Sequence, residues 1–127
     1  MDLKVFISTR KRSFAVAIQG VFYTIRSQKN TWVHSTITLI VILLGLWLKI
    51  SIQNWAILVI SMGIVWVAEF INTAIETVVD LVSPEFNIYA KISKDVSAAA
   101  VLISAITSAC VGLLILGPPL WQSLFNH

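Results

Sequence analysis

Three long stretches without a formally charged side chain dominate this sequence. They cover residues 30–48, 50–68 and 96–127. Each is as long as, or longer than, the roughly 18 apolar residues that indicate a membrane-spanning α-helix. Only 12% of the residues are charged and the mean hydropathy is +0.87, whereas about a quarter of the residues of a soluble domain are charged. The sequence therefore predicts an all-α integral membrane protein with three spanning helices.

The basic residues are distributed unevenly around the three apolar stretches. Those that precede the first stretch are Lys4, Arg10, Lys11, Arg12, Arg26 and Lys29. Lys49 alone lies between the first and second stretches, and Lys91 and Lys94 lie between the second and third. Because Lys and Arg favour cytoplasmic loops, we expect a multi-pass plasma-membrane protein with a cytoplasmic N-terminus. Anionic lipid headgroups explain the basic N-terminal segment more simply than nucleic acid does.

Residues 10–29 have the pattern of an amphipathic helix. The apolar side chains that recur at helical spacing are Phe14, Ile18, Val21, Phe22 and Ile25. The opposite face carries Arg12, Gln19, Tyr23 and Arg26. No soluble core is available for this helix to cover, so the pattern predicts a surface helix in the headgroup layer of the membrane.

The spanning helices are expected at residues 33–48, 55–82 and 96–116, within one membrane domain of residues 1–127. Pro84 ends the second helix, because the residue before a proline resists helical geometry, and "GPP" at 117–119 closes the third. The second helix would be about 42 Å long against a hydrocarbon core of about 30 Å, so its last turns project into the cytoplasm. Three spans make a thin monomer with a small-residue third helix, which favours a homo-oligomeric bundle.

A polar stripe interrupts the end of the second spanning helix. Its members are Glu69, Asn72, Glu76 and Asp80, which fall within about 80° of one another on a helix. An acid near the centre of a membrane helix costs about 2.5–3.5 kcal/mol, so the stripe should face protein or water and is a candidate functional site. A solvated helix end explains Asp80 well, Glu76 less well and Glu69 poorly.

Lys91, Lys94 and Asp95 enter the same membrane face from the next helix. Lys91 and Asp95 have the i, i+4 spacing of a simple ion pair. Carboxylates, an amide and a lysine at the cytoplasmic interface suit Mg²⁺ and phosphate, although a proton or cation pathway would use similar acids. His34 is expected as an interfacial side chain rather than a catalytic group, and Cys110 as a small packing residue.

Two segments resemble a known family. "EFINTAIETVVDLVSPEF" (residues 69–86) and "AKISKDVSAAAVLISA" (residues 90–105) resemble the prokaryotic diacylglycerol kinase and undecaprenol kinase family. The family pattern is E-x-x-N-T/S-A-I-E-x-V-V-D, followed by A-K-x-x-K-D and a helix of small residues. "SFAVAIQG" (residues 13–20) and "SQKNTWVH" (residues 27–34) extend the resemblance over most of the chain.

The resemblance implies a homotrimeric lipid kinase. Such an enzyme transfers the γ-phosphate of ATP, with Mg²⁺, to diacylglycerol or undecaprenol at the cytoplasmic surface. By position, Glu69 would be the general base, Asn72 would order the site and Lys94 would neutralise the γ-phosphate. The residues implied to bind ATP are Glu76, Glu85, Asn87, Lys94 and Asp95. Glu76 would hold the metal ion together with Gln28.

Two positions depart from the family pattern. Gln28 stands where the family usually has Glu, and its carbonyl can ligate Mg²⁺ without adding negative charge. Val16 stands where many relatives carry a Tyr that contacts nucleotide. Two other functions therefore remain as alternatives: an ion- or proton-conducting oligomer, and an inactive family member that acts as a scaffold. Asn72, Lys94 and Asp95 together favour phosphate chemistry, because a proton path needs neither a lysine nor loop acids.

Overall fold

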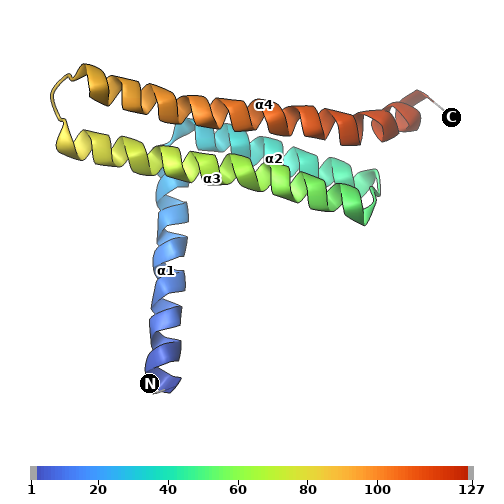
Figure 1. Ribbon diagram of the computed structural model, residues 1–127. Helices are drawn as coiled ribbons and strands as arrows, with labels where there is room; N and C mark the ends of the chain where they lie inside the picture. Colours follow the sequence, from blue (N-terminus) through green and yellow to red (C-terminus); the bar gives the residue numbers. More distant parts are fainter. Residues whose placement is uncertain (1–2, 126–127) are drawn as a thin grey trace.

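The computed structural model of the protein describes residues 3–125, which form four α-helices. They are α1 (Leu3–Ser27), α2 (Lys29–Trp47), α3 (Ile52–Val82) and α4 (Ile88–Phe125). Figure 1 shows α2, α3 and α4 side by side as a bundle, with α1 leaving the bundle sideways. Three helices are long and apolar enough to cross a membrane, over Asn30–Trp47, Ile52–Val82 and Ile88–Phe125. The all-α architecture with three spanning helices is confirmed.

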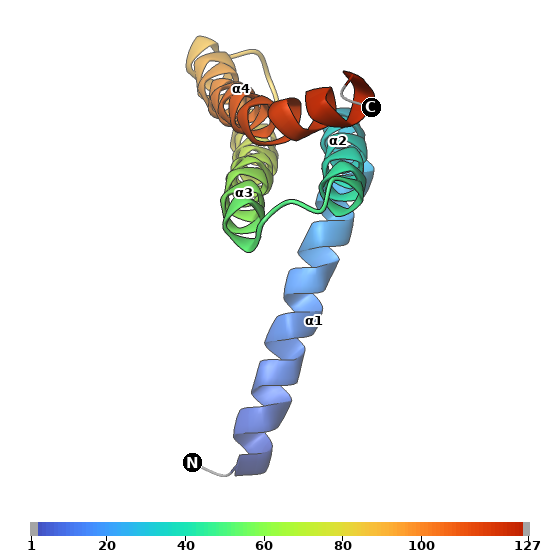
Figure 2. The ribbon, with the colours of Figure 1, turned by 90° about the vertical axis from the view of Figure 1, so that its right-hand side faces the viewer.

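The first helix has few neighbours within the chain. It runs across the direction of the other three helices and away from them (Figures 1 and 2). Its apolar side chains Phe14, Ile18 and Phe22 are 72%, 53% and 57% exposed. An unpartnered apolar face on a helix that crosses the bundle direction agrees with the surface helix expected from the sequence. The helix begins at Leu3, earlier than expected, and ends at Ser27.

A single residue in extended conformation, Gln28, separates α1 from α2. Its φ and ψ of −109° and 120° break the helical path, and this break turns α1 out of the bundle. α2 therefore begins at Lys29, four residues before its expected start.

A tight turn joins α2 to α3 on the side of the bundle opposite to the α3–α4 connection. The Ile50 N–H donates to the Gly45 carbonyl and the Lys49 N–H donates to the Leu46 carbonyl, both at 3.3 Å. This pair of bonds is a Schellman motif, in which the residue after the helix cap is left-handed. Lys49 takes that position with a φ of 50°. Ser51 then caps α3, which begins at Ile52 rather than at residue 55.

The bundle core lies mainly between α3 and α4, which pack along one another (Figure 1). The buried apolar side chains are Leu58, Val65, Val101 and Leu116. Deeper in the bundle, the Ser108 hydroxyl lies 3.3 Å from the Ser61 hydroxyl. Small residues on α4 permit this close approach, as the sequence indicated. On the other side, the Trp66 indole N–H donates to the Thr38 hydroxyl of α2 at 3.2 Å.

The expected bounds of the third spanning helix, 96–116, are too short. α4 starts at Ile88, because the Asn87 side-chain oxygen accepts the N–H groups of Tyr89 (2.8 Å) and Ala90 (3.3 Å) and so caps the helix. The "GPP" segment does not end the helix, since Pro118 and Pro119 lie inside it. Prolines in a helix interior remove backbone hydrogen bonds and cause a kink. Figure 2 shows the last turns of α4 bent towards α2.

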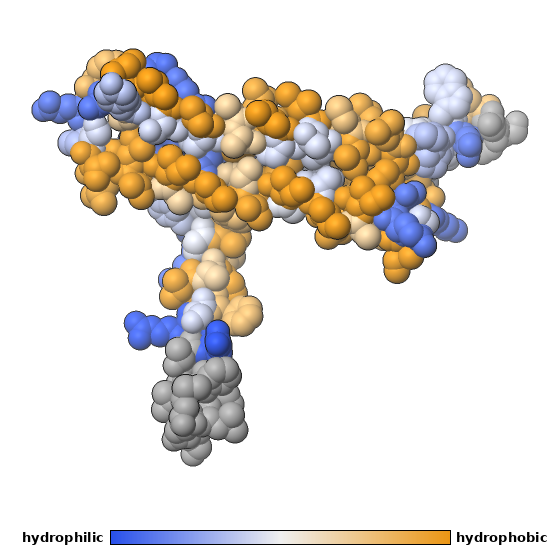
Figure 3. Space-filling view, viewed as in Figure 1, coloured by the Kyte–Doolittle hydropathy of each residue, from blue (hydrophilic) through white to orange (hydrophobic). Residues whose placement is uncertain are grey.

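The surface of the bundle matches a membrane environment. In Figure 3, hydrophobic residues cover the bundle between its ends, and hydrophilic residues gather near those ends. The 31 residues of α3 span about 46 Å, which exceeds a hydrocarbon core of about 30 Å. Figure 1 shows the ends of α3 and α4 near residues 80–90 extending past the point where α1 leaves the bundle. The chain is thus a multi-pass membrane protein.

The α2–α3 turn generates a stability prediction. A Cβ atom at Gly45 would lie 2.8 Å from two ring carbons of Trp55, so Gly45→Ala must displace the indole. We expect a loss of about 1–3 kcal/mol of unfolding free energy, measured as a lower thermal midpoint in detergent micelles. Gly112→Ala is the matched control, because its new Cβ meets nothing within 4 Å. A midpoint for Gly45→Ala equal to that of the control would contradict the expectation.

Candidate active site

The carboxylate of Glu69 is enclosed by protein. Its side chain is 2% exposed, and both of its oxygens face residues of α2. The Thr31 hydroxyl donates to Oε1 at 3.0 Å, and His34 Nε2 lies 3.8 Å from Oε2. Thr31 is fully buried and its hydroxyl also lies 3.4 Å from the Thr24 carbonyl at the end of α1. The acid that would be most costly in lipid therefore sits where three helices meet.

Glu76 lies two helical turns closer to the α3–α4 connection and is held by two amides. The Gln28 side-chain N–H₂ donates to Oε2 at 2.6 Å, and the Asn72 side-chain N–H₂ donates to Oε1 at 3.2 Å. Hydrogen bonds to the charged form of a carboxylate stabilise it. The break between α1 and α2 at Gln28 is what brings this side chain to α3.

Asn72 connects this cluster to α4. It is buried, and its side-chain oxygen accepts a hydrogen bond of 2.7 Å from Ser97, which is also buried. The Ser97 hydroxyl lies 2.9 Å from the backbone carbonyl of Lys94 as well. A hydroxyl has one proton, and the contact of Ser97 with the Asn72 oxygen is the shorter of the two, so we assign the proton to that hydrogen bond. Asn72 therefore couples the helix that carries Lys94 to the Glu76 carboxylate.

These side chains line a pocket of about 300 Å³ between α2, α3 and α4. Its polar wall consists of Gln28, Asn30, His34, Glu69, Asn72 and Glu76. Its apolar wall consists of Val33, Ala98, Val101, Leu102 and Ala105. A pocket with one polar and one apolar wall suits an amphiphilic molecule, whose polar group would face the carboxylates.

The other residues implied by the resemblance lie outside this pocket. Lys94 pairs with Asp80 at 2.7 Å, and Lys91 pairs with Asp95 at 2.6 Å, which confirms the expected i, i+4 ion pair. Asn87 caps α4, and Glu85 lies in the α3–α4 connection.

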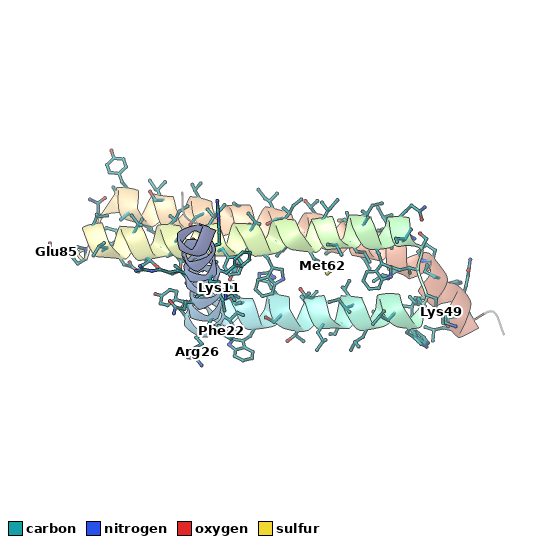
Figure 4. The ribbon with its side chains drawn as sticks, turned by 90° about the horizontal axis from the view of Figure 1, so that it is seen from below. Lys11, Phe22, Arg26, Lys49, Met62 and Glu85 are labelled. Atoms are coloured by element: carbon teal, nitrogen blue, oxygen red, sulfur yellow. The ribbon has the colours of Figure 1, made fainter. Side chains whose placement is uncertain are left out.

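Figure 4 looks along α1 and places Glu85 and Lys49 at opposite ends of the bundle, with α1 nearer to Glu85. The structure thus brings Gln28, Glu69, Asn72 and Glu76 together. The other residues expected to contact nucleotide lie towards the end of the bundle that carries the α3–α4 connection; they are Glu85, Asn87, Lys94 and Asp95.

The structure adds three residues to the predicted site. Thr31 and Ser97 bind Glu69 and Asn72, and His34, predicted as an interfacial side chain, lies against Glu69. Thr31 and His34 are three residues apart, so they share a helix face. The spacing argument that identified the acids on α3 would have found these two on α2.

The oxygen atoms available to a cation are few. Among residues 3–125, no group of three or more His, Cys, Asp or Glu side chains is arranged to hold a metal ion. Glu76 supplies one carboxylate, and the Gln28 and Asn72 amides beside it donate N–H groups to that carboxylate, so the Gln28 oxygen reaches a cation only after the amide rotates. One or two carboxylates suffice where substrate phosphates provide further ligands for Mg²⁺, so this set fits a cation that binds together with a phosphate compound.

Comparison with known proteins adds to this geometry. The family model described as prokaryotic diacylglycerol kinase matches residues 15–116. The undecaprenol kinase of Bacillus subtilis is 36% identical over 109 residues, which cover 86% of this chain and 89% of that protein.

Two further relatives are named diacylglycerol kinases. The Synechocystis protein is 38% identical over 109 residues, covering 85% of this chain and 62% of the relative. The Escherichia coli K12 protein is 26% identical over 110 residues, covering 81% and 90%. The family match includes all three segments that line the pocket. The chain therefore belongs to the prokaryotic diacylglycerol kinase family of lipid kinases.

Proposed function

We propose that this lipid kinase transfers the γ-phosphate of ATP to the hydroxyl of a membrane lipid alcohol, with undecaprenol and diacylglycerol as the candidate acceptors. The observation that carries the proposal is the buried carboxylate of Glu69 in a pocket with one polar and one apolar wall. The Bacillus subtilis relative is named undecaprenol kinase and the Synechocystis relative diacylglycerol kinase. Both acceptors present a primary hydroxyl on an apolar tail.

In this proposal Glu69 is the general base. The Thr31 hydroxyl occupies Oε1, which leaves Oε2 to accept the proton of the lipid hydroxyl. The apolar wall of the pocket, including Leu102 and Ala105, continues along α4 into the membrane and suits the first carbons of the lipid tail. Phosphoryl transfer depends mainly on positioning and charge stabilisation, and a fixed carboxylate oxygen supplies the positioning.

Glu76 and Gln28 are proposed to hold the Mg²⁺ ion that accompanies ATP. When bound, the cation would neutralise part of the negative charge of the phosphate groups. Gln28 now directs its N–H₂ group at Glu76, so it must rotate its amide to present the carbonyl oxygen to a cation. That rotation breaks the 2.6 Å hydrogen bond, and this loss opposes metal binding.

Lys94 is proposed to bind the γ-phosphate. Its ammonium group is now paired with Asp80, and a phosphate with more negative charge competes for the same donor. Asp95, Glu85 and Asn87 lie on the same end of the bundle and are proposed to border the nucleotide. This arrangement lets ATP approach from the cytoplasm and the lipid from within the membrane, with the N-terminus and the α3–α4 connection on the cytoplasmic side of the plasma membrane.

The same proposal includes a homotrimer. Its support is the family resemblance and an uncovered apolar groove of about 930 Å³ between α3 and α4, lined in part by Ile64, Val67, Ile71 and Val96. A single three-helix bundle leaves this groove uncovered, and neighbouring copies in a trimer would cover it.

Native mass spectrometry from detergent micelles should detect a species of three times the 14.1 kDa chain mass. That species should persist across a dilution series, because close packing between membrane helices stabilises the complex. One or two copies per particle at every concentration would overturn the trimer.

The assay that tests the kinase uses labelled ATP and Mg²⁺ with undecaprenol and diacylglycerol presented separately in mixed micelles. We expect one or both lipids to be labelled, and Glu69→Gln to reduce the rate by about 10²–10⁴-fold, as the loss of a general base does. Thr36→Ala is the control, because Thr36 is exposed and its hydroxyl donates to the Trp32 carbonyl of its own helix. Labelling of neither lipid would overturn the proposed function, and ion flux through proteoliposomes would then be measured.

Gln28→Glu tests the metal site. A second carboxylate beside Glu76 should lower the Mg²⁺ concentration at half-maximal activity by about tenfold, which corresponds to about 1.4 kcal/mol of binding free energy. Gln28→Ala serves as the comparison, since it removes the hydrogen bond to Glu76 without adding charge. An unchanged Mg²⁺ requirement in Gln28→Glu would exclude residue 28 from the metal site.

A further inference from the structure

The enclosure of Glu69 creates a problem for its proposed role as a base. Glu69 precedes Glu76 by seven residues on α3, which places it roughly 10 Å deeper in the bundle. Its side chain is 2% exposed, so the carboxylate is largely shielded from bulk solvent. Each phosphoryl transfer from ATP to an alcohol leaves one proton behind, and Glu69 must lose that proton before the next turnover.

Most neighbours of Glu69 cannot take up this proton. The Thr31 hydroxyl is already a donor to Oε1. The amides of Asn72 and Gln28 do not accept protons near neutral pH. The apolar wall from α4, which includes Val101 and Leu102, carries no titratable group.

Among the side chains that the structure describes (residues 10–28 and 30–125), His34 is the basic one that lies within 4 Å of the Glu69 carboxylate. Its Nε2 is 3.8 Å from Oε2, whereas Thr31 donates to the other oxygen, Oε1. The His34 side chain is 16% exposed, so it reaches from the buried oxygen to the surface of the pocket. Asn30 lies one turn closer to the start of α2 on the same face and is exposed at the mouth of the pocket.

We propose that His34 is the proton exit of the site. This proposal rests on the proposed function. In that reaction the lipid O–H bond breaks as the new O–P bond forms, and the bond between the γ-phosphorus and the ADP oxygen breaks. The hydroxyl proton passes to Glu69 Oε2, then to the neutral Nε2 of His34, and from the imidazolium to water near Asn30. The sum is one alcohol and one ATP converted to one phosphate monoester, one ADP and one proton.

The chemistry of the two groups suits this transfer. An imidazole ring has two nitrogens, so it can accept a proton at one nitrogen and release a proton from the ring elsewhere, which is why histidine serves as a proton shuttle. Among the side chains that the structure describes, the charged groups that line the pocket are Glu69 and Glu76, both on α3, and Glu76 is held by amides. A separation of 3.8 Å shortens to hydrogen-bond distance with a small side-chain rotation, and catalytic hydrogen bonds are often long before substrate binds.

Chemical rescue tests the proposal. His34→Ala should lower kcat for the labelled lipid by about tenfold or more in a weakly buffered assay, with the KM for lipid and ATP nearly unchanged. Added imidazole should restore turnover in proportion to its concentration, and methylimidazoles of different basicity should restore it to different extents. A side chain with a purely structural role gives no such dependence on the base in solution.

His34→Gln and Thr36→Ala complete the design. His34→Gln keeps a polar side chain of similar reach, so it should assemble even if His34→Ala does not, and it should show the same low kcat and a stronger dependence on buffer concentration than the native chain. Thr36→Ala should behave as the native chain does.

The outcomes separate the two proposals. An active native chain with a His34→Gln rate within about twofold of it would overturn the proton exit alone. So would a large loss in both variants that no imidazole or buffer restores. No labelling by the native chain would overturn the proposed function itself, and the proton exit with it.

Discussion

The structure depends on the cost of placing the Glu69 carboxylate in a helix that crosses a membrane. An unpaired acid at that depth costs several kcal/mol, so the bundle must enclose it. Thr31 and His34 from α2 meet its two oxygens, and the carboxylate is 2% exposed as a result. The position of α2 against α3 is therefore tied to this residue, and the contacts from α2 hold its carboxylate in one orientation.

The one-residue break at Gln28 has a second consequence for the site. It turns α1 away from the bundle and at the same time presents an amide to Glu76. The Gln28 amide and the Asn72 amide of α3 hold the Glu76 carboxylate between them. Asn72 in turn accepts a hydrogen bond from Ser97 of α4. The surface helix and the three spanning helices thus meet in one continuous set of hydrogen bonds. The site therefore lies between the apolar pocket wall formed mainly by α4 and the polar side chains of α2 and α3.

Much of this arrangement could be predicted from patterns along the chain. Three uncharged stretches identified the spanning helices, and the spacing of Glu69, Asn72 and Glu76 identified one face of α3 as the site. The ends of the helices were predicted less well. Asn87 extends α4 at its start by capping it, and the helix passes through Pro118 and Pro119, because a kinked helix inside a bundle tolerates the lost hydrogen bonds.

By itself, the sequence determined the fold class, the spanning segments and the family, because hydropathy, helical spacing and motif order are properties of the linear chain. The tertiary structure decided the partners of each polar group. It turned His34 from the interface towards Glu69, set Gln28 as a donor to Glu76, and paired Lys94 with Asp80. These contacts join residues 14 to 48 positions apart, and helical periodicity specifies which residues share a face without specifying which faces meet.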